Sequence, residues 1–117
     1  MNTVEVSVAL KLLNIPSSGV YPADRIPHIW PRPMGIVVNT DIHSKPGSHW
    51  IAIYVDLHGN GVFFDSYGLA PSIGYHIRQL QKNTKIYKWN TKQLQSLNSK
   101  VCGQYCIMFL NYLTRGY

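Results

Sequence analysis

The sequence predicts an α+β fold, and three observations point to it. Apolar residues recur at helical spacing near both ends of the chain, whereas short β-branched and aromatic runs occupy its middle. Eight Tyr, three Trp and three Phe are many for this length and favour sheet packing and binding grooves over a coiled coil. With 117 residues, 45% hydrophobic and 14% charged, we expect a single domain, residues 1–117, with one core.

The first element is expected to be a helix from about residue 3 to 13. Asn2 and Glu5 have the spacing of a capping box, and Val6 and Leu10 fall on one helical face. A strand is the alternative, because every second residue from 4 to 12 is also apolar. Residues 15–33 contain five prolines, which remove backbone donors and block helix, so an irregular loop is expected there.

The middle of the chain predicts a small antiparallel sheet. Residues 34–39 are typical of a short strand, 49–55 of a longer buried one and 61–65 of a third. The turn at 56–60 joins the last two strands into a hairpin. Residues 84–89 form a further short strand in this interpretation.

Two more helices follow from the periodicity. Helical spacing indicates a helix from about residue 72 to 82, with Ser72 as a candidate cap. A last helical stripe contains Cys102 and Cys106 and ends the chain. Two cysteines one helical turn apart are too few for a disulfide framework and indicate free thiols.

Charge and hydropathy limit the partners and the compartment. Eleven Lys and Arg against five Asp and Glu give a net charge of +6, which favours an anionic partner such as nucleic acid. Four lysines with Trp89 among them are the candidate nucleic-acid-binding residues, with a solvated face as the alternative: Lys82, Lys85, Lys88 and Lys92. The sequence has neither an apolar run of about 18 residues nor a secretory start, so we expect an intracellular protein in a reducing compartment with no membrane partner.

Cys102 is the first candidate for chemistry. A cysteine at the first turn of a helix meets the positive end of the helix dipole, which stabilises a thiolate. Its own amide is a natural oxyanion donor, and Gly103 would let a substrate backbone approach. The alternative for Cys102 is a small buried apolar residue, which is the interpretation we give Cys106.

A cysteine nucleophile needs a base and a group that orients the base, and His49 and Asp65 fit these roles. A five-residue hairpin loop sets Asp65 opposite Ile51 and makes His49 its diagonal neighbour, about 7 to 8 Å away. A four-residue loop would turn Asp65 to the other face. One CxxxC pair without a second ligand pair is a poor zinc signature, so we expect neither a metal nor another cofactor.

Three blocks of sequence then match a known family. Residues 47–50 (GSHW), 64–68 (FDSYG) and 95–103 (QSLNSKVCG) resemble the adenains, the adenovirus-type cysteine proteases related to ubiquitin-like-protein proteases. The order His, Asp, Gln, Cys is similar to that clan and differs from papain, where the cysteine comes first. The resemblance runs from about residue 19 to 113 and implies a papain-like fold, with the cysteine-bearing helix packed on one side of a small central antiparallel sheet.

The resemblance also implies roles for individual residues. His49 would be general base and acid, Asp65 would orient it, and Cys102 would attack the scissile carbonyl. Gln95, seven residues before the cysteine, would complete the oxyanion hole, with Gln93 as its rival. Trp50 is similar to the aromatic residue after the family's histidine and would wall the active site, with core packing as the alternative.

Taken together, these expectations describe a thiol endopeptidase that processes viral or virus-like structural proteins at Gly-Gly-like sites. Its partners would be a polypeptide substrate and, by the resemblance, a DNA or peptide activator, with the host nucleus or the virion as its location. One alternative is a deconjugase for ubiquitin-like modifiers, which the short chain disfavours because such enzymes grip a folded substrate broadly. The other alternative is a basic nucleic-acid-binding module without enzymatic activity. The sequence does not determine the oligomeric state.

Overall fold

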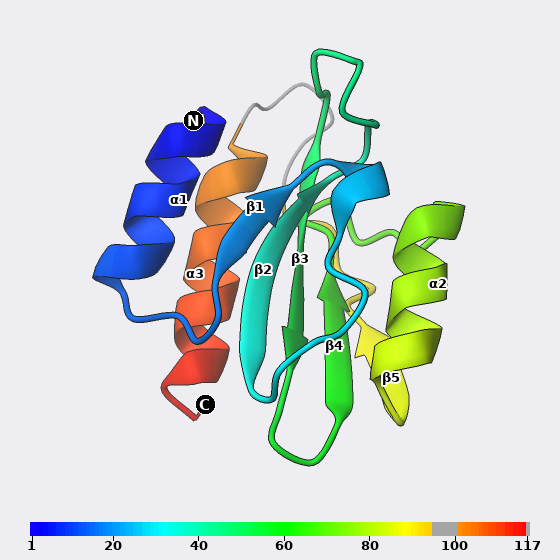
Figure 1. Cartoon of the computed structure of the whole chain (residues 1–117). Helices are drawn as coiled ribbons and strands as arrows, with labels where there is room; N and C mark the ends of the chain where they lie inside the picture. Colours follow the sequence, from blue (N-terminus) through cyan, green and yellow to red (C-terminus); the bar gives the residue numbers. More distant parts are fainter. Residues whose placement is uncertain (95–100, 117) are drawn as a thin grey trace.

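A computed structural model describes residues 1–94 and 101–116 and shows a five-stranded sheet with helices on both faces (Figure 1). The strands lie side by side in chain order. Their bounds are β1 Gly19–Tyr21, β2 Met34–Asn39, β3 Trp50–Val55, β4 Asn60–Phe64 and β5 Ile86–Trp89.

The pairing of the strands confirms the antiparallel centre and corrects the edges. Strands β2, β3 and β4 are antiparallel, as expected, but β1 runs parallel to β2 and β5 runs parallel to β4. Each parallel pair is joined by a long crossover, which a parallel connection requires. The sheet is therefore mixed.

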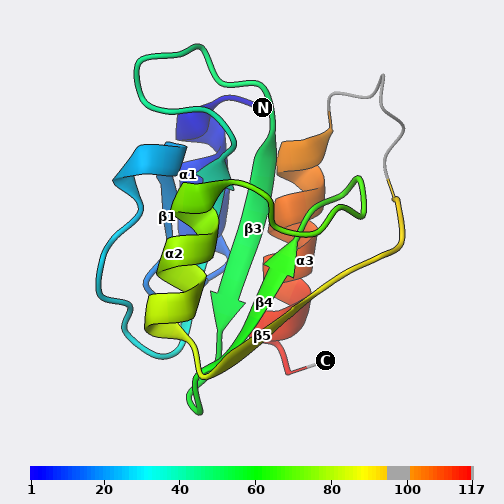
Figure 2. The ribbon, with the colours of Figure 1, turned by 90° about the vertical axis from the view of Figure 1, so that its right-hand side faces the viewer.

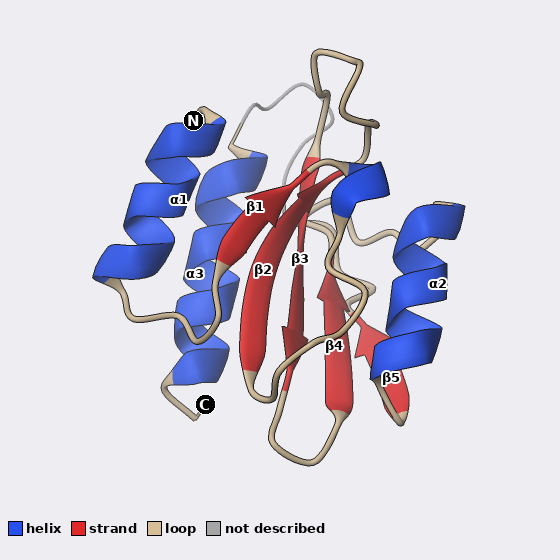
Figure 3. Cartoon of the chain, in the orientation of Figure 1, coloured by secondary structure: helices blue, strands red, loops and turns tan. Residues whose placement is uncertain are grey.

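Three α-helices cover the sheet: α1 Thr3–Leu12, α2 Gly74–Asn83 and α3 Cys102–Thr114. Figure 3 shows α1 and α3 on one side of the sheet and α2 on the other, and Figure 2 views the molecule from the side of α2. The helical prediction for the first segment is confirmed and the strand alternative is wrong. Asn2 and Glu5 form the expected capping box, with Asn2 Oδ1 accepting from the Glu5 amide at 2.8 Å.

The buried apolar residues form two clusters, one on each face of the sheet, and not the single core expected. One cluster includes Ile36, Ile53 and Leu80, and lies between the sheet and α2. The other includes Val37 and Leu110, and lies under α1 and α3. Two clusters form because the central strands bury both of their faces.

Two local expectations are wrong. Ser72 does not cap α2, since the N-cap is Ile73 and makes no side-chain capping bond. The proline-rich segment is not entirely irregular, since it contains β1 and a 3-10 helix, Ala23–Arg25. None of its prolines lies within β1, so that strand keeps the donors that it needs to pair with β2. No helix in the described part of the chain is long and apolar enough to cross a bilayer.

Candidate active site

The three residues predicted to do chemistry lie at one end of the sheet. His49 directly precedes β3, Asp65 directly follows β4, and Cys102 is the first residue of α3. Figure 2 shows the start of β3, the end of β4 and the start of α3 at the same end of the molecule. The paired residues of β3 and β4 end at Ala52 with Phe64, and this register extended by one residue sets Ile51 opposite Asp65, as the five-residue loop predicts.

His49 and Asp65 form a shielded ion pair. His49 Nε2 lies 2.8 Å from Asp65 Oδ1, and only 11% and 9% of the two side chains are exposed. The Tyr67 amide donates to the same carboxylate oxygen at 2.9 Å. The Asp65 side chain therefore cannot rotate away from His49 without breaking two hydrogen bonds.

Asn90, which directly follows β5, holds the backbone of Asp65. Its Oδ1 accepts from the Asp65 amide at 3.0 Å, and its Nδ2 donates to the Asp65 carbonyl at 2.7 Å. Gly68 closes the turn after Asp65 at a φ of +77°, and a Cβ there would lie 2.8 Å from the Lys92 carbonyl carbon. This turn therefore packs against the segment after β5 only with glycine at position 68.

The Tyr67 ring stacks on the His49 ring. Their centroids are 4.3 Å apart and their planes differ by 11°. An aromatic face in this position attracts a cation, so it favours the imidazolium form of His49 and holds the ring in its plane. Sequence reasoning missed this role, because no local pattern signals a ring stacked across 18 residues of chain.

The environment of His49 favours its charged form. Burial would lower the pKa of His49, but Asp65 and the adjacent Cys102 outweigh it and raise the pKa from 6.5 to about 9. Among the described residues no hydrogen bond of normal geometry reaches His49 Nδ1. Cys102 contributes to the raised pKa of His49 both through its side chain and through its charge.

The same environment favours the thiolate of Cys102. Burial would raise the pKa of the thiol, but the His49 ring and the backbone amides of Trp50 and Gly103 lower it below its usual 9.0. The start of α3 acts in the same direction, because the first amides of a helix have no partners within it. An imidazolium and a thiolate side by side are the reactive form of a cysteine nucleophile.

Cys106 lies one turn further along α3 in a different setting. It is fully buried, its Sγ donates to the Trp50 carbonyl at 3.5 Å, and burial raises its pKa well above 9.0. The assignment of this cysteine to the core is confirmed.

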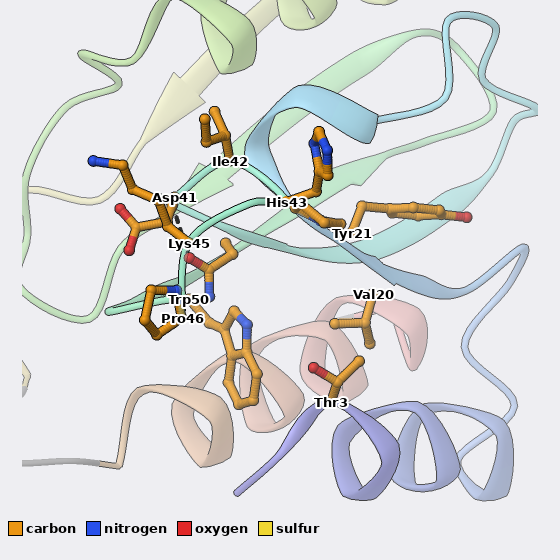
Figure 4. A pocket seen from close by; sticks show the side chains of 12 residues that line it. Thr3, Val20, Tyr21, Asp41, Ile42, His43, Lys45, Pro46 and Trp50 are labelled. Atoms are coloured by element: carbon orange, nitrogen blue, oxygen red, sulfur yellow. Dashed lines mark hydrogen bonds between the residues drawn. The ribbon is translucent and has the colours of Figure 1, made fainter.

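A cleft opens beside Cys102. A pocket of about 530 Å³ is lined by His49, Trp50, Tyr67, Cys102 and the first three residues of the chain. A second pocket of about 220 Å³ shares Trp50 and continues the cleft toward β1 (Figure 4). Figure 4 shows the Trp50 indole on one side of this second pocket, with Val20 and Tyr21 on the other.

Trp50 has both of the roles predicted for it, whereas the role of Gly103 differs from the prediction. Trp50 lines the cleft and also packs on the apolar cluster under α1 and α3. Gly103 is buried, and a Cβ there would lie 2.9 Å from Trp50 Cε3. The missing side chain of Gly103 therefore makes room for the indole of Trp50, and not for an approaching substrate backbone as we expected.

The oxyanion donor predicted from the resemblance, Gln95, lies outside the described residues. Its neighbour Leu94 is held on two sides: the Leu94 amide donates to the Ser66 carbonyl at 2.8 Å, and Tyr105 Oη donates to the Leu94 carbonyl at 2.9 Å. The rival, Gln93, is exposed. The chain is thus tied to the turn after Asp65 and to the first turn of α3 immediately before Gln95.

The four candidate nucleic-acid-binding lysines are all exposed but do not share one face. Lys82 lies in the last turn of α2. Lys88 lines a pocket on the opposite side of the sheet, next to Leu113 of α3. Lys85 and Lys92 flank β5. In residues 1–94 and 101–116, no three His, Cys, Asp or Glu side chains converge as a metal site.

A cysteine at a helix start facing a paired His and Asp on an α+β fold is the arrangement of the cysteine protease class. No protein-family model matches the chain. The sequence is 31% identical over 91 residues to a thiol protease of Acanthamoeba polyphaga mimivirus, an alignment that covers 68% of this chain and 30% of that protein. It is 33% identical over 88 residues to a cysteine protease of African swine fever virus, covering 65% of this chain and 32% of that protein.

An adenovirus relative and a solved structure agree with these matches. The chain is 29% identical over 89 residues to the protease of bovine adenovirus C, covering 64% of this chain and 45% of that protein. The crystal structure of the African swine fever virus protease matches with a TM-score of 0.52 and 28% identity, covering 71% of this chain and 35% of that one. The chain is therefore a homologue of viral cysteine proteases, which confirms the resemblance, and it spans less than half the length of these relatives.

Proposed function

We propose that the chain is a thiol endopeptidase in which Cys102 is the nucleophile, His49 the general base and acid, and Asp65 the residue that orients His49. The observation that carries this proposal is the shielded pair of His49 Nε2 and Asp65 Oδ1 at 2.8 Å beside a cysteine whose pKa is lowered. The homology to viral cysteine proteases supports the same assignment.

The first half of the reaction is acylation. The Cys102 thiolate attacks the scissile carbonyl carbon, and the negative charge moves to the carbonyl oxygen, where the Cys102 amide and the Gln95 side chain donate hydrogen bonds. The imidazolium of His49 then gives its proton to the leaving amine, and a thioester remains on Cys102.

The second half returns the enzyme to its starting form. His49, now neutral, takes a proton from water, and the water oxygen attacks the thioester carbonyl. When the tetrahedral intermediate collapses, the acid product leaves and Cys102 regains its thiolate beside a protonated His49. Asp65 keeps Nε2 of the ring facing away from the thiol throughout, so that Nδ1 faces the reacting atoms.

A peptide vinyl sulfone tests the nucleophile directly. We expect the reagent to label Cys102 and to spare Cys106, because the pKa values of the two thiols are shifted in opposite directions. Peptide mapping by mass spectrometry locates the adduct, and Cys102→Ala is the control. Equal labelling of both cysteines, or labelling of Cys106 alone, would overturn the assignment.

For the substrate, we propose viral or virus-like structural proteins cut at Gly-Gly-like sites. This rests on the family resemblance and on relatives that are themselves viral proteases. A peptide series with Gly-Gly, Ala-Gly and Leu-Leu before the cleaved bond tests the preference. A kcat/KM for Leu-Leu equal to that for Gly-Gly would contradict it.

A deconjugase for ubiquitin-like modifiers is the second candidate, since one African swine fever virus relative is named a SUMO-1 cysteine protease. Cleavage of a folded modifier fusion without cleavage of short peptides would favour it. The basic module without enzymatic activity has less support, because the structure divides its lysines between two faces of the sheet edge.

A further inference from the structure

The ladder between β4 and β5 ends before it reaches Asp65. Its last pair is Phe63 with Trp89, where β5 also ends. The same register extended along the chain would place residue 91 beside Asp65, two residues beyond the end of β5. Asp65 is buried, and buried backbone amides and carbonyls need hydrogen-bond partners. The Asp65 backbone therefore needs partners at the point where the β5 backbone no longer supplies them.

The side chain of Asn90 takes the place of the missing strand. Its Oδ1 accepts from the Asp65 amide at 3.0 Å, and its Nδ2 donates to the Asp65 carbonyl at 2.7 Å. A primary amide offers a donor and an acceptor side by side, as a peptide group does, so one asparagine serves both backbone groups of one residue. Nδ2 also donates to the Lys92 carbonyl at 3.2 Å, so the following segment holds the Asn90 side chain in turn.

These bonds set the direction in which the Asp65 side chain leaves the backbone. The Gly68 amide donates to the Asp65 carbonyl at 2.8 Å, and the Tyr67 amide donates to Asp65 Oδ1 at 2.9 Å. Asn90 adds the bond to the Asp65 amide, so the residue is held on both sides of its Cα. The carboxylate oxygen that lies 2.8 Å from His49 Nε2 thus starts from a fixed backbone.

We propose that Asn90 is a positioning residue for the catalytic centre: its side-chain amide extends the β5 edge and keeps the Asp65 carboxylate against His49. The inference rests on the proposed function, in which Asp65 orients His49. Catalytic groups must be held within about 0.5 Å of their productive geometry, so a looser Asp65 backbone impairs that orientation. Asparagine suits the position because aspartate lacks the donor for the Asp65 carbonyl.

The ionisation of His49 reports the position of the Asp65 carboxylate. In the described part of the chain, the other titratable groups that face this pair lie on α3, on the turn after β4 and on α2: Cys102, Tyr67 and His76. Replacement of Asn90 leaves all of these groups in place. A change in the pKa of His49 in an Asn90 variant therefore measures a movement of Asp65.

An NMR titration of the His49 ring in Asn90→Ala is the test, with His49→Gln to assign the signal. The pKa is about 9 in the parent and should fall by about one unit, because the carboxylate keeps its charge but loses its fixed distance to the ring. The basic limb of kcat/KM should move equally, with a fall in kcat and little change in KM. The ring titration needs no turnover, so its outcome is separate from that of the proposed function.

Asn83→Ala is the matched control. Asn83 is half-buried like Asn90, and its side chain also accepts from one backbone amide, that of Trp30 at 3.1 Å, and donates to one backbone carbonyl, that of Gln79 at 3.0 Å. It is the last residue of α2, which ends at the opposite end of the sheet from the start of β3 (Figure 1). This variant should lower the melting temperature about as much as Asn90→Ala and leave the pKa of His49 unchanged.

A double variant tests whether Asn90 acts through Asp65. Asp65→Asn removes the charge that Asn90 positions, so the addition of Asn90→Ala to it should lower the pKa of His49 no further. Asn90→Ser is a second single variant, because its hydroxyl keeps the position polar but ends one atom short of the asparagine amide. Circular dichroism and the melting temperature establish that each variant is folded.

Four results would overturn the proposal. The first is a folded Asn90→Ala or Asn90→Ser protein in which the pKa of His49 equals that of the parent. The second is an equal fall in Asn83→Ala, and the third is a further fall of about one unit in the double variant. The fourth is loss of the fold in both Asn90 variants, which would make Asn90 a residue of general stability.

Discussion

Replacement of Asp65 by asparagine tests whether one carboxylate holds the charge on His49. Asparagine keeps the size of the side chain, and its Oδ1 can still accept from His49 and from the Tyr67 amide, but the negative charge is gone. Burial alone would lower the pKa of His49, and Asp65 is the first of the groups that oppose burial. We therefore expect the imidazolium to lose most of its stabilisation in Asp65→Asn.

The magnitude follows from the shift of the His49 pKa. The rise from 6.5 to about 9 corresponds to about 3 kcal/mol in favour of the charged ring, at about 1.4 kcal/mol per unit. Cys102 supplies a part of this, so the loss of Asp65 should lower the pKa by about 1.5 to 2 units. The kcat should fall by at least about 10-fold, because the charge that orients and stabilises the imidazolium is absent.

The assay is kcat/KM against pH with a fluorogenic peptide, since its basic limb reports loss of the His49 proton in the free enzyme. That limb should lie near pH 9 in the parent and near pH 7 in Asp65→Asn. A titration of the His49 ring by NMR gives the same pKa without turnover. A basic limb that stays near pH 9 in the variant, or a change in KM alone, would refute the reasoning.

Stability should depend on pH in the same way. The folded pKa of His49, about 9, lies above the unfolded value of 6.5, so the charged ring stabilises the fold fully below pH 6.5. This contribution is lost as the pH rises through 9. The difference in unfolding free energy between the parent and Asp65→Asn, measured by urea denaturation, should be largest near pH 6 and shrink by about 2 to 3 kcal/mol toward pH 9.5, which is the part of the shift that Asp65 supplies.

Four further predictions concern other parts of the site. Cys102→Ala should abolish peptide cleavage and keep the fold, whereas Cys106→Ala should lower the melting temperature more than the activity; normal turnover by Cys102→Ala would exclude it as nucleophile. Gln95→Ala should lower kcat by about 10² to 10³ and Gln93→Ala hardly at all, so equal mild effects would remove the side-chain oxyanion donor. Tyr67→Leu should lower the pKa of His49 by about half a unit, seen as a shift of the basic limb that Tyr67→Phe does not produce. DNA that contacts the lysines of only one face near β5 should show a slope of log affinity against log salt near about −2. Replacement of all four lysines by Gln should weaken this binding, and an absence of salt-dependent binding would mean that the lysines only face solvent: Lys82, Lys85, Lys88 and Lys92.

The local patterns of the sequence were enough for the elements that carry the site. The hairpin of β3 and β4 was predictable because side chains alternate along a strand, and a five-residue loop leaves only one register with Asp65 opposite Ile51. The start of α1 was predictable because Asn2 and Glu5 lie three residues apart, so that each side chain reaches the backbone amide of the other within one turn. Both features depend on contacts between residues that are close in the chain.

Long-range packing decided the remainder. Asn90 comes to hold the Asp65 backbone only because α2 carries the chain back to place β5 parallel to β4. Position 103 requires glycine because the Trp50 indole fills the space that a Cβ would occupy. No residue spacing in the sequence reveals this contact.

The sequence by itself determined which residues could do chemistry and which strands and helices would carry them, because periodicity, capping and turn length are local properties of the chain. Only the tertiary structure decided that Tyr67 stacks on His49, that Lys82 and Lys88 lie on opposite sides of the sheet, and that Val4, Val8 and Leu12 of α1 are exposed. The physical reason is that burial and ring contacts depend on the surfaces that meet in three dimensions. The alternating apolar residues of α1 also fitted a strand, and packing of the predicted face, with Val6 and Leu10, under α1 and α3 excludes that alternative.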